Sequence, residues 1–88
     1  MNFKGTNENW QVNSAYKKEV NSDKGVIIAN CSQSKIIDDA EKEANAKLIA
    51  ASPDLLKACN FVLQDIKNGQ VDELTVKILE NAISKALS

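Results

Sequence analysis

Residues 43–59 read EANAKLIAASPDLLKAC, and this stretch decides how the C-terminal half of the chain is expected to fold. Its first part is rich in alanine. Ser52-Pro53-Asp54 then introduces a proline, which disfavours a helical conformation at Ser52 and lacks an N–H donor. The same three residues are typical of a helix start, with Ser52 as the N-cap and Pro53 at the first helical position. The stretch therefore predicts a helix, a break and a second helix.

The first of these helices is expected to begin at Asp38 or Asp39, where a carboxylate can accept hydrogen bonds from the free N–H groups of the first turn. Apolar residues recur along it at helical spacing and form a narrow, alanine-rich face that is expected to pack on the rest of the protein. That face comprises Ile37, Ala40, Ala44, Leu48 and Ala51.

The second helix is expected to end at Lys67-Asn68-Gly69, because glycine suits the left-handed conformation that follows a helix. After a short turn, Asp72 is the expected N-cap of a last helix that runs back antiparallel to the second. The wide apolar face of this last helix needs cover, which predicts a homo-oligomer. The face comprises Leu74, Ile78, Leu79, Ala82, Ile83, Ala86 and Leu87.

The N-terminal half is richer in β-forming and turn-forming residues. Trp10-Gln11-Val12, residues 15–20 and residues 26–31 are expected strands, and residues 21–25 are an expected turn. The predicted fold class is α+β: a small antiparallel β-meander of about three strands packed on C-terminal helices, of which the last two form a hairpin. Residues 1–88 are expected to form a single domain, β-rich over 1–37 and helical over 38–88.

The composition argues against several classes of protein. No run of about 18 apolar residues could span a membrane, and the first ten residues lack the apolar core of a signal peptide, so a cytoplasmic protein is expected. All eleven cations are lysines, and histidine is absent. Arginine is the usual reader of guanine, and histidine is the commonest general base and metal ligand. We therefore expect no sequence-specific DNA binding, no enzymatic activity, no metal site and no cofactor.

Two cysteines, Cys31 and Cys59, leave two interpretations open. Free cysteine packs as a small hydrophobic residue, which suits two buried thiols in a cytosolic protein. The alternative is a disulfide between the two.

Four residues in the N-terminal half combine aromatic rings with positive charge. Trp10, Tyr16, Lys17 and Lys18 are expected on or beside the sheet, where such a group can stack a base and neutralise a phosphate. The other interpretation places Trp10 in the core and the lysines in solvent.

Asn45 is also unusual, because asparagine is a poor helix former inside an alanine-rich helix. Either its amide bonds the backbone of a neighbouring element, or it contacts a ligand.

The motif EANAKLIAASPDLL resembles that of a widespread group of small phage and prophage proteins. Their usual plan is a Trp-x-Val strand, an apolar strand and then this helical motif, and the similarity here covers about residues 9–60. The group includes the anti-Thoeris sponge proteins, which sequester cyclic ADP-ribose signals of bacterial immunity. Some of these proteins also hold cyclic dinucleotides or trinucleotides in hexamers.

The resemblance implies a phage immune-evasion protein, active in the infected host, that binds a cyclic nucleotide at a subunit interface without cleaving it. Asn45 and Lys47 are then the ligand-binding positions of the motif, and Tyr16, Trp10 or Phe3 would stack a base. Lys47 occupies the Lys/Arg position of the family, whose sponges use arginine for phosphates. Two alternatives remain open: an inhibitor that binds a host defence protein directly, as anti-CRISPR proteins do, or a phage accessory protein without a defence role.

Overall fold

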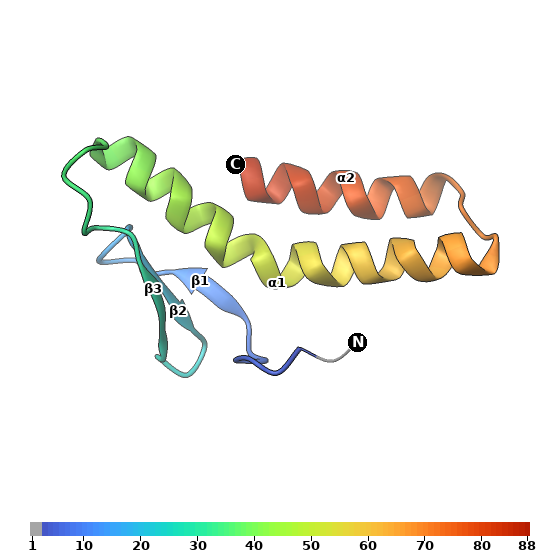
Figure 1. The fold of residues 1–88 in the computed structure, drawn as a ribbon, viewed down its shortest axis with the longest axis horizontal. Coiled ribbons are helices and arrows are strands. Elements are labelled where there is room, and N and C mark those ends of the chain that lie inside the picture. Colours follow the sequence, from blue (N-terminus) through green and yellow to red (C-terminus); the bar gives the residue numbers. More distant parts are fainter. Residues whose placement is uncertain (1–2) are drawn as a thin grey trace.

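The computed structural model describes residues 3–88. Three short strands, β1 (Trp10–Val12), β2 (Glu19–Ser22) and β3 (Ile27–Asn30), precede two helices, α1 (Asp39–Asn68) and α2 (Glu73–Leu87). The sheet lies against the first half of α1, and α2 packs back along the second half (Figure 1). This arrangement confirms the α+β class, with an antiparallel meander followed by a C-terminal helical hairpin.

The sheet has the order β1-β2-β3, and both pairs of neighbouring strands are antiparallel. Val12 and Ala29 lie opposite Val20 from either side, and Val20 is fully buried. The central strand therefore carries the one fully buried apolar side chain of the sheet, and α1 contacts all three strands. The register of β2 against β3 shifts between Val20 and Asn21.

The second strand begins later than the predicted 15–20. The reason lies at Asn13, whose side-chain Oδ1 accepts the backbone N–H groups of Ala15 (2.8 Å) and Tyr16 (3.1 Å). This local bonding is typical of asparagine and holds the chain in a loop instead of a strand. The predicted turn is likewise shorter, since Asn21 and Ser22 belong to β2, while Gly25 has the expected left-handed conformation at φ 83°.

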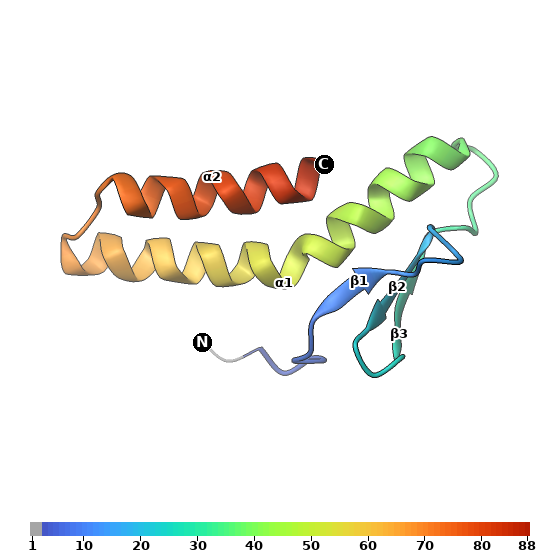
Figure 2. The same cartoon turned by 180° about the vertical axis from the view of Figure 1, so that it is seen from behind.

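The predicted break at Ser52-Pro53-Asp54 is wrong, because α1 runs through it without interruption. Pro53 removes one hydrogen bond from the helix and favours a kink, and Figures 1 and 2 show that α1 bends near its middle. The Ser52 hydroxyl donates to the Leu48 carbonyl (3.1 Å) on the turn before the proline. Packing on the sheet before the bend and on α2 after it outweighs the single lost bond.

The predicted packing face of the helix is also partly wrong. Ala46 is fully buried and Ala51 nearly so, but Ala40 and Ala44 are exposed and Leu48 is 51% exposed. Ala46 lies on the half of α1 that contacts the sheet, so we infer that the side of the helix carrying Ala46 faces the strands, which helical spacing alone does not reveal. A bare methyl group there lets the helix approach the strands closely.

The other predicted helix ends, at Asp38, Gly69 and Asp72, are confirmed. Asp38 caps α1 by accepting the Glu41 N–H (2.8 Å), and Gly69 follows the helix with φ 68°. Asp72 begins α2 with a reciprocal capping box: its carboxylate accepts the Thr75 N–H (3.1 Å), and its own N–H donates to the Thr75 hydroxyl (3.3 Å). These motifs satisfy backbone groups that every helix end leaves free.

Among the described residues, few apolar side chains are buried, and most of them are alanines. They are Val20, Ala46, Ala51, Ala58 and Ala86. Within residues 3–88, no helix is long and apolar enough to cross a membrane.

Candidate functional site

Four of the six predicted site residues gather where the β1–β2 loop faces the first half of α1. Residues 15–19, with Asn30, Ser32 and Glu43, line a hollow of about 380 Å³. Residues 12–14, with Lys17, Glu43 and Lys47, line a second hollow of about 370 Å³. Because Lys17 and Glu43 belong to both, the two hollows adjoin, and we call them together the lysine site.

Tyr16 and Lys17 owe their position to the structure of the β1–β2 loop. The Asn13 side chain holds the first half of the loop, while the Glu19 N–H donates to the Tyr16 carbonyl (2.9 Å) and closes the second half. Tyr16 is left 70% exposed. An aromatic ring in that state is free to stack on a planar ligand at the rim of the site.

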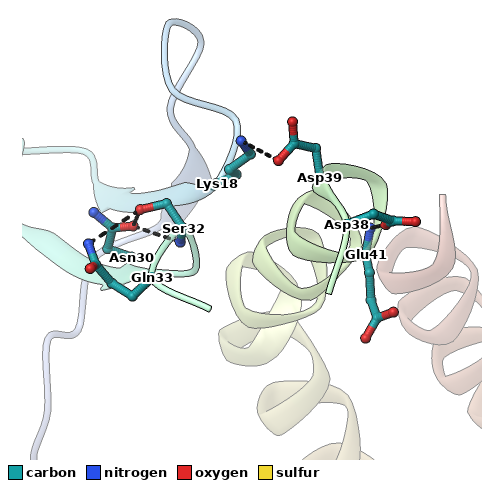
Figure 3. A network of polar contacts seen from close by, with 7 residues as sticks. All are labelled: Lys18, Asn30, Ser32, Gln33, Asp38, Asp39 and Glu41. Atoms are coloured by element: carbon teal, nitrogen blue, oxygen red, sulfur yellow. Dashed lines mark hydrogen bonds and ion pairs between the residues drawn. The ribbon is translucent and has the colours of Figure 1, made fainter. Parts of the chain in front are cut away.

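The lysines of the site differ in whether their ammonium groups already have a partner within the protein. Lys18 Nζ lies 2.9 Å from the Asp39 carboxylate at the start of α1 (Figure 3). Lys47 Nζ donates to the Ser88 carbonyl oxygen (3.2 Å). Lys17 forms no ion pair with any residue in the described range 3–88. Of the three, Lys17 is therefore the ammonium group with neither an ion pair nor a hydrogen bond in the described range, which leaves it the most accessible to an anionic ligand.

The Lys18 ammonium lowers the pKa of Asp39, both by a hydrogen bond and by its charge. A lowered folded-state pKa stabilises the protein above the ordinary aspartate value of about 3.9, and this stabilisation is lost as the pH falls through the lowered pKa. We expect Lys18→Met to reduce the loss of stability between pH 7 and pH 3, measured as the shift in the midpoint of urea unfolding. An equal loss in both proteins would contradict this pairing.

Polar groups of the 30–33 segment form the other wall of the first hollow. Asn30 Oδ1 accepts the backbone N–H (2.9 Å) and the hydroxyl (2.5 Å) of Ser32, and Gln33 Nε2 donates to that hydroxyl (3.5 Å; Figure 3). These bonds fix the Asn30 side chain at the edge of the site. Within residues 3–88, no group of three or more Cys, Asp or Glu side chains is placed to hold a metal ion.

Trp10 lies apart from the lysine site. It lines an apolar hollow of about 240 Å³ between the N-terminal segment and the bend of α1, where Pro53 and Leu56 form the opposite wall. Its indole N–H donates to the Thr6 carbonyl (3.2 Å), and the Phe3 ring meets it edge-on at 6.3 Å. Trp10 thus ties the N-terminal segment to the bend of the helix.

Asn45 occupies a further hollow, which it shares with Cys31, Ile37 and Leu48. Its amide makes no hydrogen bond to a neighbouring element in the described part of the chain, so the structure does not support the backbone-bonding interpretation. Asn30 lines both this hollow and the lysine site, so the two are neighbours. A ligand role for Asn45 stays a prediction.

Sequence reasoning missed Glu43, the residue common to both hollows of the lysine site. A signal for it was present, because Glu43 and Lys47 are four residues apart and so share one face of a helix. The cysteines are both free, with Cys31 half-buried and Cys59 exposed instead of buried.

Comparison with curated proteins and with solved structures yields no match to this chain. A family model does match. It is described as Salmonella phage P22 protein Y8K6, and it covers residues 1–88. This confirms the similarity to small phage proteins at the level of the family, and the chain belongs to the phage protein family of Salmonella phage P22 protein Y8K6.

Proposed function

We propose that this phage-family protein binds and sequesters a cyclic nucleotide immune signal, such as a cyclic ADP-ribose isomer or a cyclic oligonucleotide, without cleaving it. It would do so as a homo-oligomer in the cytoplasm of the infected bacterium. The observation that carries the proposal is the lysine site, where the exposed Tyr16 shares one hollow with Lys17 and Lys18, and Lys17 shares the adjoining hollow with Lys47. Aromatic stacking together with cationic side chains is the usual means of holding nucleotides without sequence readout.

The size and polarity of the lysine site suit such a ligand. Each hollow falls in the range of about 300–1,000 Å³ that is typical of small-molecule sites. Lys17 supplies a point charge for a phosphate, and Tyr16 supplies a face for a base. Glu43, between the two hollows, is placed to accept hydrogen bonds from ribose hydroxyls, a role that carboxylates have in dinucleotide-binding proteins.

Release of an intact ligand is part of the proposal. The chain has no histidine, the side chain most often used as a general base. A ligand with two bases would extend past Asn30 into the neighbouring hollow, where the Asn45 amide offers both a donor and an acceptor. In this arrangement Trp10 does not contact the ligand and supports the fold at the bend of α1, apart from the site.

Thermal unfolding with added ligand tests the proposal. A ligand that binds only the folded state at one hundred times its Kd adds about 2.7 kcal/mol of stability, so Tm should rise by several degrees with at least one cyclic ADP-ribose isomer or cyclic oligonucleotide. Heating should then release the ligand with its mass unchanged. The double variant Tyr16→Ala/Lys17→Ala should lose the shift, while Lys35→Ala, which lies outside the site, should keep it. No shift with any of these ligands, or a cleaved product, would refute the proposal.

A second candidate is an inhibitor that binds a host defence protein directly. It is favoured by the exposed apolar side chains of the helical hairpin, among them Ile66, Val76 and Ile83. An accessory phage function would require neither surface. The thermal test separates the first candidate from both of these, since only sequestration predicts stabilisation by a cyclic nucleotide.

A further inference from the structure

The solvent-accessible surface of the single chain is larger than expected for a folded monomer of its mass. A folded monomer of 9.6 kDa is expected to expose about 5,100 Å², whereas this chain exposes 6548 Å². Its radius of gyration is 15.0 Å, against about 12 Å for a domain of this length. The excess of roughly 1,400 Å² of accessible surface indicates that part of the surface of the single chain is available to be covered by a partner.

Most of the exposed large apolar residues within residues 3–88 lie on the two helices. Three apolar residues of α1 and three of α2 recur at helical spacing and are all exposed; Ile66 is 58% exposed and Leu87 is 81% exposed. We call this set the hairpin face, and it consists of Cys59, Leu63, Ile66, Val76, Ile83 and Leu87.

The two halves of the hairpin face lie on the same side of the hairpin. The other side is marked by the ion pair of Asp54 with Lys85 (2.5 Å), which joins the two helices. At 3.6 residues per turn, Cys59 is about 140° around α1 from Asp54, and Ile83 is about 160° around α2 from Lys85. Because α1 and α2 run antiparallel, these two rotations place both apolar stripes on the side of the hairpin opposite the ion pair. The stripes therefore lie next to each other and form one continuous surface.

We propose that a second copy of this chain covers the hairpin face, so that two hairpins pack face to face as a four-helix bundle. A stable interface needs about 800 Å² from each partner, which the excess surface supplies. A face that is apolar over both helices is complementary to itself across a twofold axis, as a homodimer requires. Cys59 stands near the middle of the face and comes close to the axis.

The lysine site stays open in this dimer. Glu43 and Lys47 precede Asp54 by eleven and seven residues, which places them on the Asp54 side of α1, away from the hairpin face. Dimer formation therefore does not rest on the proposed ligand, and Tyr16→Ala/Lys17→Ala should remain a dimer whether or not it binds a nucleotide.

Light scattering with point variants tests the interface. The unmodified protein should have a mass of about 19 kDa at micromolar concentration, twice the 9.6 kDa of one chain. Ile83→Asp should raise the dimer dissociation constant by at least about 30-fold, as expected for a central interface residue. Leu74→Asp is the matched control, because Leu74 is 61% exposed on the other side of the hairpin, and it should leave the mass unchanged.

A thiol measurement tests the same interface without any substitution in the hairpin face, so it does not depend on whether Ile83→Asp folds. In Cys31→Ser, the remaining Cys59 thiol should react at least about tenfold more slowly with a disulfide reagent at 100 μM protein than at 0.1 μM, since the dimer buries it. The proposal is overturned by a monomer mass at 100 μM, by Cys59 reactivity that does not depend on concentration, or by an assembly that Leu74→Asp dissociates and Ile83→Asp does not.

Discussion

Replacing Ala46 with leucine is expected to destabilise the protein by about 1–3 kcal/mol, because three further carbon atoms must fit where helix and sheet already touch. Ala46 is fully buried on the half of α1 that contacts the sheet, and Val20 is fully buried in the central strand. The buried core of the described residues contains few large side chains, so little rearrangement is available to relieve the strain. Urea unfolding followed by circular dichroism should show a clearly lower midpoint.

Ala44→Leu is the matched control, because Ala44 lies two residues away on the same helix and is exposed. The added leucine meets solvent there, and the midpoint should move by less than about 0.5 kcal/mol. The comparison also decides which face of α1 meets the sheet. If Ala44→Leu were the more damaging change, the sheet would pack on the face that spacing alone predicted.

Thr75→Val is expected to destabilise the protein by about 1.5–3 kcal/mol, although it barely changes the volume of the side chain. Thr75 is 3% exposed, and its hydroxyl donates to the Asp65 carboxylate on α1 while accepting the Asp72 N–H. Hydrogen bonds to charged groups are worth about this much, and valine leaves both partners without the hydroxyl. Calorimetric Tm values for both proteins give the size of the loss.

Thr75→Ser separates the hydrogen bonds from the packing. Serine keeps the hydroxyl and loses only a methyl group, so it should retain most of the stability that valine loses. Equal losses in Thr75→Ser and Thr75→Val would show that the methyl group, and not the bonds to Asp65 and Asp72, holds the hairpin together.

The candidate site was predictable only in part. The pairing of aromatic and cationic residues at Tyr16, Lys17 and Lys18 is local in the sequence, so their proximity could be foreseen, but the loop that holds them could not, because a strand was expected there. That Lys47 would join them, and that Trp10 and Asn45 would lie in other hollows, depends on how the helix is turned about its axis. No local pattern determines that rotation when both faces of the helix carry alanine.

The sequence by itself determined the order of a β-meander followed by helices, and three of the helix ends. Asp38, Gly69 and Asp72 act through bonds to backbone groups a few residues away, and such local chemistry is fully written in the sequence. Only the tertiary structure decided that α1 continues through Pro53, that Ala46 and not Ala44 meets the sheet, and which apolar residues stay uncovered. Each of these depends on packing between distant segments, whose free energy exceeds the local preference of a proline or an alanine.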